Sequence, residues 1–227
     1  MTKRRKWTAI PGLIALAVGA VIISAYSGAS SSQNNSPVQP IPFTHPVHVQ
    51  KLGMNCLYCH NAANKSMDPG LPAVSTCMGC HTMVGPERPA TDLGPKRTSA
   101  GIQALYKFAD SKATGMGMGP NAKPIPWIRI HKLPEYVHFP HTRHVTAGVT
   151  CQTCHGQVQK MERVSQFSTL NMGWCVSCHV NGYSAKEGVE AAGYSAEQQG
   201  TPASPAPAAI VNGERKKARY DCANCHY

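Results

Sequence analysis

One short pattern, Cys-x-x-Cys-His, constrains this chain more than any other feature of its sequence. It occurs five times in 227 residues, at 56–60, 77–81, 151–155, 175–179 and 222–226, and it uses all ten cysteines. The pattern is the attachment signature of a c-type haem, in which the two cysteines form thioether bonds to the porphyrin and the adjacent His coordinates iron. The sequence therefore predicts five covalently bound haem c groups.

The predicted attachment residues form two sets. The thioether bonds come from Cys56, Cys59, Cys77, Cys80, Cys151, Cys154, Cys175, Cys178, Cys222 and Cys225, and the proximal iron ligands are His60, His81, His155, His179 and His226. Zinc ribbons and redox dithiols also use Cys-x-x-Cys. A zinc ribbon, however, pairs one Cys-x-x-Cys with another and needs no following His, and five copies leave one without a partner. A disulfide framework would not space its cysteines so uniformly.

Composition indicates that the haems themselves form most of the core. Aromatic residues make up only 7% of the chain, and its 20 Gly and 18 Pro favour loops over long regular elements. So few large apolar side chains can build only a small protein core. We therefore predict a multihaem cytochrome c fold that is mostly irregular, with short α-helices packed around five haems and one N-terminal transmembrane helix.

The formal net charge of +11 does not indicate a nucleic-acid partner in this chain. Each haem carries two propionates, so five haems bring about ten negative charges and offset most of the excess. No basic patch interleaved with aromatic residues supports nucleic-acid binding either.

The N-terminal segment has the pattern of a membrane anchor. A basic cluster at 3–6 precedes twenty residues without charge at 7–26, a length that spans about 30 Å as a helix. Basic residues before the span place the N-terminus in the cytoplasm, and the haem region on the periplasmic side of a bacterial cytoplasmic membrane. A cleaved signal peptide is the competing interpretation, with residues 27–29 as a weak cleavage site.

An internal repeat organises the rest of the chain. Phe-x-His-x-x-His occurs at 43–48 and again at 139–144, and two haem sites follow each copy. Gly53 and Gly148 each stand three residues before the first cysteine of their copy. We predict a basic tip and transmembrane anchor at 1–27, a flexible tether at 28–40, a first dihaem module with a connecting insertion at 41–126, a second dihaem module at 127–182, and an extended arm with the fifth site at 183–227. Within the insertion, residues 99–111 are expected to contain one short helix.

The sixth ligand of each iron decides between an electron relay and an enzyme, because only an open face can bind substrate. Six of the eleven His lie outside the attachment motifs. His45 and His48 recur as His141 and His144, and we predict that these four are distal ligands. For the fifth distal ligand, His131 and His138 compete, and a Met is the other candidate type. The available Met residues are Met67, Met116, Met118 and Met161.

The repeated Phe-x-His-x-x-His resembles that of the small multihaem cytochromes of the c3/c7 type. The whole arrangement is most similar to the pentahaem membrane-anchored subunit of alternative complex III, a bacterial quinol oxidoreductase. The likeness covers the anchor, the haem count, both modules, the C-terminal site and the segment 126–134. In such relatives the position of His138 is often Tyr, which favours His131 as the fifth distal ligand. The Ala- and Pro-rich arm has no counterpart that we can place in the family.

This resemblance implies partners and a role. The partners would be an iron–sulfur subunit related to molybdopterin oxidoreductases, polytopic quinol-binding membrane subunits and a monohaem cytochrome c. Quinol would be oxidised in those partners, and this chain would pass the electrons to a soluble cytochrome c or a copper protein, with no chemistry of its own.

Three other functions compete with this one. A membrane-anchored quinol dehydrogenase of the NapC/NrfH kind would bind quinol beside a haem of this chain. A multihaem nitrite reductase is disfavoured, because all five motifs end in His and the spare His are numerous enough to cap every iron. A stand-alone periplasmic carrier is disfavoured by the apolar N-terminal segment.

Overall fold

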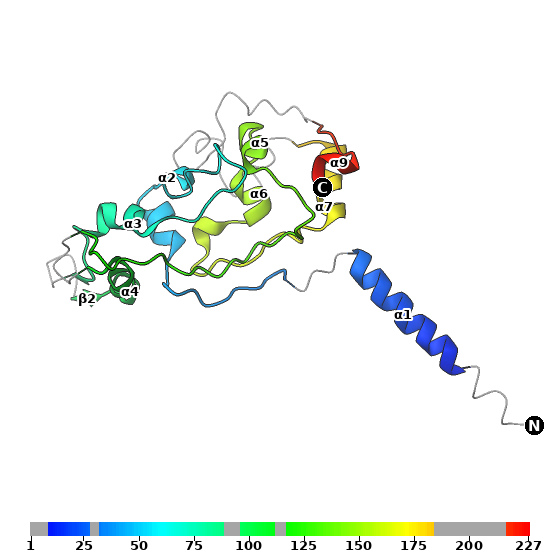
Figure 1. Cartoon of the computed structure of the whole chain (residues 1–227), viewed down its shortest axis with the longest axis horizontal. Helices are drawn as coiled ribbons and strands as arrows, with labels where there is room; N and C mark the ends of the chain where they lie inside the picture. The colour runs from blue at the N-terminus through cyan, green and yellow to red at the C-terminus, as the bar shows by residue number, and fades with distance from the viewer. Residues whose placement is uncertain (1–8, 28–31, 89–95, 112–116, 184–216) are drawn as a thin grey trace, which may run out of the picture.

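The computed structural model describes residues 9–27, 32–88, 96–111, 117–183 and 217–227 (Figure 1). Its helices are short and are joined by long irregular segments, as the composition predicts. In chain order the elements are α1 (Ala9–Ser27), η1 (Pro46–Lys51), α2 (Cys56–Cys59), α3 (Val74–His81), β1 (Glu87–Arg88), β2 (Arg97–Thr98), α4 (Ala100–Ala109), α5 (His141–Thr146), α6 (Cys151–His155), η2 (Val158–Lys160), α7 (Met172–Asn181) and α9 (Cys222–Cys225). Strands β1 and β2 form one small antiparallel pair.

Local capping explains where several helices begin. The Ser99 hydroxyl accepts a hydrogen bond from the main-chain N–H of Ile102 at the start of α4, and the side chain of Asn171 accepts one from Trp174 at the start of α7. Helix α4 ends at Asp110, which has a left-handed conformation (φ 51°). The prediction of one short helix within 99–111 is therefore confirmed.

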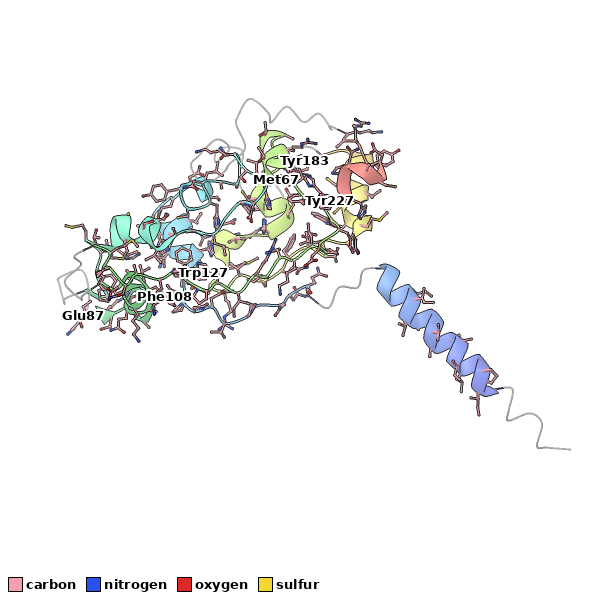
Figure 2. The ribbon with its side chains drawn as sticks, viewed as in Figure 1. Met67, Glu87, Phe108, Trp127, Tyr183 and Tyr227 are labelled. Carbon is pink, nitrogen blue, oxygen red and sulfur yellow. The ribbon has the colours of Figure 1, made fainter. Side chains whose placement is uncertain are left out.

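The apolar core lies at one end of the haem region, between α3 and α4. Its buried residues are Ile41, Val74, Met78, Leu105, Tyr106, Ala109 and Ile125, with Trp127 packed against them. Tyr106 also donates a hydrogen bond to the main-chain carbonyl of His81, which ties α4 to the second attachment motif. Figure 2 labels Phe108 and Trp127 beside this core.

The second half of the chain buries polar side chains instead. Its buried polar residues are Thr150, Gln152, Gln159, Gln166 and Ser168. The Ser168 hydroxyl donates to the carbonyl of Cys154, and the Gln166 amide donates to the carbonyl of Ser168. These bonds satisfy polar groups but supply little hydrophobic stabilisation, so the fold around the third to fifth motifs needs another source of packing.

The segment before the first module differs from the flexible tether predicted at 28–40. Residues 28–31 lie outside the described residues. The following residues run along the second half of the chain, where Asn34 and Asn35 form main-chain hydrogen bonds with Gln166. Further on, the side chain of Gln39 both accepts from and donates to the main chain of Ile128. Residues 32–40 are thus held by non-local hydrogen bonds, which a Ser- and Asn-rich composition does not reveal.

Helix α1 projects away from the haem region (Figure 1). Its large apolar side chains are exposed: Ile10, Leu13, Ile14, Leu16, Val18, Val21, Ile22 and Ile23. Within the described residues, no helix combines the length and the apolarity needed to cross a membrane, so the predicted transmembrane anchor is not confirmed.

Candidate functional site

The two cysteines of each attachment motif lie on a short helix. Both cysteines of a motif fall within one element, on α2, α3, α6, α7 or α9, and a spacing of three residues places them on the same side of a helix. All ten cysteines lie among the described residues and all are free thiols. The described cysteines thus form no disulfide, and each motif presents two thiols on one side of its helix, with its His in the helix or directly after it.

The first three motifs lie next to one another in the order second, first, third. Burial, and after it the nearby thiol of Cys77, raises the pKa of Cys59, which brings the second motif to the first. A hydrogen bond between the thiols of Cys56 and Cys151 lowers the pKa of Cys56 and raises that of Cys151, which brings the first motif to the third. Both interactions require the thiols of the neighbouring motifs to lie close together.

The remaining motifs extend the same row. Burial, and after it the thiol of Cys178, raises the pKa of Cys154 to about 12, so the fourth motif adjoins the third. Burial and then Cys225 raise the pKa of Cys175, so the fifth motif adjoins the fourth. The attachment helices accordingly follow one another along the haem region as α3, α2 and α6, with α7 and α9 together at the far end (Figure 1). Order in space therefore differs from order in the sequence only at the first two motifs.

Three motif histidines face a second His at a nearly constant distance. The ring centroids are 6.2 Å apart for His48 and His81, 6.0 Å apart for His144 and His179, and 6.5 Å apart for His141 and His155. A ring nitrogen binds a transition metal at about 2 Å and lies about 1 Å from its ring centre, so two His on opposite faces of one iron have centroids about 6 Å apart. The three pairs fit axial ligation of haem iron.

Main-chain carbonyls orient many of these rings. The Nδ1 atom of His48 lies 3.0 Å from the carbonyl oxygen of Thr44, that of His81 lies 2.9 Å from Val84 O, and that of His179 lies 2.6 Å from Arg219 O. The same kind of contact is made by His60, His141 and His144. A carbonyl only accepts, so each contact fixes the proton on Nδ1 and leaves the Nε2 lone pair for a metal, the usual arrangement of ligating His.

The two copies of the repeat share their local geometry. The ring of Phe43 stacks on His48 with centroids 4.4 Å apart, and Phe139 stacks on His144 at 4.3 Å. In each copy the Phe also meets the first His edge-on, at 4.9 Å and 4.8 Å. Gly53 and Gly148 both have positive φ, 65° and 86°, which a residue with a side chain rarely adopts. The repeat seen in the sequence is thus a repeated ligand-positioning device.

Burial keeps the central histidines neutral. Burial, followed by the nearby His131 and His141, lowers the pKa of His155 to about 3. Burial, followed by His60 and His48, lowers the pKa of His45 to about 4. At neutral pH both rings are therefore uncharged, which is the form of imidazole that binds a metal.

The two histidines without a repeat counterpart occupy different places. His131 lies at the third motif, where its ring meets His155 edge-on with centroids 4.4 Å apart, and its buried Nε2 has no hydrogen-bond partner. His138 lies at the fifth motif. Its main-chain N–H donates to the carbonyl of Cys225, and its ring Nδ1 is 3.1 Å from the hydroxyl of Tyr227. An unpartnered buried nitrogen among other His is consistent with a metal ligand. His138, like the rings described above, has a partner at Nδ1, and what sets it apart is that its main chain is bonded to the fifth motif itself.

The fifth motif differs from the others in its surroundings. Val137 and His226 form an isolated antiparallel bridge, and the ring of Tyr136 lies against His226 with centroids 5.7 Å apart and planes 27° apart. Sequence reasoning missed Tyr136 and Tyr227, because aromatic residues near a motif carry no signal without the pairing of 136–138 with 225–227. It also missed the carbonyl partners of Nδ1, because main-chain acceptors leave no trace in residue type.

Comparison with known proteins gives one informative relative, and no family model matches the chain. The chain is 26% identical over 163 residues to the multihaem cytochrome c subunit of menaquinone reductase from Nitratidesulfovibrio vulgaris (strain Hildenborough), which covers 63% of this chain and 68% of the relative. The attachment motifs, the paired histidines and this relative together support a multihaem c-type cytochrome with covalently bound haem c.

Proposed function

We propose that the chain is a membrane-attached pentahaem cytochrome c that relays electrons between a quinone-linked membrane complex and a periplasmic redox protein. The observation that carries the proposal is the row of five attachment motifs in which three proximal histidines each face a second His at 6.0–6.5 Å. Haem iron supplies one-electron chemistry, and an iron held on both faces transfers electrons without binding a substrate. The chain contributes the order of the sites and the orientation of their ligands.

The proposed ligand set follows the repeat. His48, His141 and His144 serve the second, third and fourth sites, each opposite the motif His that it faces. The first site has two candidates. His45 is the repeat counterpart of His141 and its charge interacts with His60. Each of the two candidates has one buried ring nitrogen without a hydrogen-bond partner, Nδ1 in His45 and Nε2 in His131.

Two directions of electron flow are candidates. The resemblance to alternative complex III favours flow from quinol to a periplasmic cytochrome c or copper protein. The relative in N. vulgaris is a subunit of a menaquinone reductase, which favours flow toward menaquinone. For either direction we propose partner subunits of the kinds that the resemblance implies: an iron–sulfur subunit, polytopic quinone-binding subunits and a monohaem cytochrome c. A chain that binds quinol itself is the remaining alternative.

Five haems per chain is the first expected result. Mass spectrometry of the mature chain should show five covalently added haem groups, because both cysteines of every Cys-x-x-Cys-His motif lie on one helix as free thiols. A variant with Cys222→Ala and Cys225→Ala should carry four. A mature wild-type chain with fewer than five haems would contradict the pentahaem assignment.

Redox titration of whole membranes tests the quinone link and its direction. Anaerobic membranes that contain the intact complex receive a quinol analogue, and the haem absorbance is followed; matched membranes from a strain without this chain are the control. Haem reduction by quinol supports the first direction, and oxidation of pre-reduced haem by a menaquinone analogue supports the second. If quinone or quinol causes no change in haem absorbance, both directions of electron flow are wrong. Oxidation of quinol by the isolated chain would favour the alternative in which this chain binds quinol itself.

We further propose that α1 attaches the protein to the membrane, since its large apolar side chains are 51–72% exposed and apolar surface of this kind is stabilised by lipid. Deleting residues 1–27 should give a haem-loaded protein that no longer sediments with membranes. A matched variant with Lys3 to Lys6 replaced by Ala should still sediment. The deleted protein is assayed without its partner subunits, so that retention in the membrane fraction would contradict attachment through α1.

A further inference from the structure

The fifth attachment site is the one for which the chain offers no second His. All eleven His of the sequence lie among the described residues, so their placement can be followed completely. Five belong to the attachment motifs. Of the other six, His48, His141 and His144 face motif histidines of the second to fourth sites, and His45 interacts with His60 of the first. Only His131 and His138 remain for the fifth site.

His131 lies at the third motif, in the middle of the row. The centroid of its ring lies 4.4 Å from that of His155, with the two planes at 73°. His131 also interacts electrostatically with His141, which belongs to the same third site. The fifth motif lies elsewhere: α9 is placed with α7 at one end of the row, beyond α6, which carries the third motif (Figure 1). A side chain held at the third site cannot also cap the fifth.

His138 is too close to the fifth motif to cap it. The main-chain N–H of His138 donates to the carbonyl of Cys225 over 2.8 Å, and the adjacent Val137 forms a main-chain bridge with His226. Paired main chains run about 5 Å apart. An imidazole reaches about 6 Å from its Cα to the iron that it binds, so two His on opposite faces of one iron need their Cα atoms about 12 Å apart. His138 therefore shares the side of His226.

Tyr136 and Tyr227 complete the same side of the site. Tyr136 lies against the His226 ring, and the N–H of Tyr227 donates to the carbonyl of Tyr136 over 3.3 Å. These contacts place both tyrosines beside His226 and the segment that carries His138, and within the described residues the His226 ring makes no other ring contact. The described residues at this end are exposed: residues 217–223 are all solvent-accessible, and Tyr227 is 85% exposed. Figure 2 shows Tyr227 at this end of the haem region, apart from Phe108 and Trp127 at the other.

We infer that the haem attached at Cys222 and Cys225 has an exchangeable sixth position, open to small neutral ligands such as water, carbon monoxide or imidazole, whereas the other four haems are closed by His. This inference rests on the proposed haem content and adds to it. It makes the exposed end of the row chemically distinct: the fifth iron combines a protein ligand held by Tyr136 with an accessible second face. The expectation from the sequence that every iron is capped by this chain then holds for four sites.

Carbon monoxide binding tests the inference on the intact, haem-loaded, detergent-solubilised chain. Carbon monoxide is added to the dithionite-reduced protein, and the fraction of haem that binds it is measured by absorbance against total haem. We expect one haem in five to bind. The variant with Cys222→Ala and Cys225→Ala should lose that fraction, and His48→Ala should add a second binding haem.

Several outcomes would overturn the inference. Wild-type protein that takes up no carbon monoxide would mean that the fifth iron is capped. Full uptake by the variant that lacks the fifth haem would place the open iron elsewhere. If His138→Ala raised the binding fraction, His138 would be a ligand after all. A wild-type chain that carries five haems yet binds no carbon monoxide would refute the open site and leave the relay function standing, whereas a chain with fewer haems would refute the pentahaem proposal first.

Discussion

Without its haems the chain should lose nearly all of its free energy of unfolding, a loss of about 5–15 kcal/mol for a domain of this kind. Among the described residues, the large buried apolar side chains belong to one cluster between α3 and α4, and the helices that carry the motifs have only 4 to 10 residues. Helices this short are unstable in water unless they pack against something. In this fold the porphyrins supply most of that apolar surface.

The loss of stability on removal of haem should differ between the two halves of the chain. The buried polar residues Thr150, Gln152, Gln159, Gln166 and Ser168 all lie in the second half, which has no apolar cluster of its own among the described residues. The packing of Leu105 and Tyr106 around α4 involves only protein side chains, so we expect it to persist in the absence of haem. The region of α6 and α7 should therefore become protease-sensitive first.

The measurement compares two preparations of the same sequence. One is exported and matured with haem; the other is produced in the cytoplasm, where thioether attachment does not occur. Circular dichroism should show a cooperative thermal transition for the first preparation only, and limited proteolysis of the second should leave fragments from 96–127. A sharp transition in the haem-free chain, or protection of residues 151–183, would contradict a haem-built core.

Motif spacing in the sequence identifies the attachment residues and the repeat, and the geometry of Phe43 with His48 and of Phe139 with His144 repeats accordingly. The short helix at 100–109 was predictable because Ser99 supplies its cap locally. Contacts between distant segments were not. The Arg219 carbonyl that orients His179 comes from 40 residues further along the chain, and the bridge of Val137 with His226 joins segments 89 residues apart. Such contacts depend on topology, which residue type does not encode.

Distal-ligand variants are expected to change single haems. His48→Ala and His144→Ala should each convert one low-spin, six-coordinate haem to a high-spin haem that binds carbon monoxide, because each removes the ring that faces a motif His at 6.2 Å or 6.0 Å. Electron paramagnetic resonance of the oxidised protein counts the high-spin signal against total haem. His138→Ala is the matched control: the main chain of His138 is bonded to that of Cys225, on the side of His226, so removing this imidazole should leave the spin count unchanged.

The first site is decided by two further variants measured in the same way. His45→Ala should raise the high-spin count by one if the repeat governs ligation, since His141 holds the equivalent position against His155 at 6.5 Å. His131→Ala should do so instead if its unpartnered, buried Nε2 is the ligand atom. A gain in one variant and not in the other assigns the ligand, because only one His can occupy the sixth position of one iron. If neither variant changes the count, no His outside the motifs caps the first site, and the equivalence of the two modules fails at that iron.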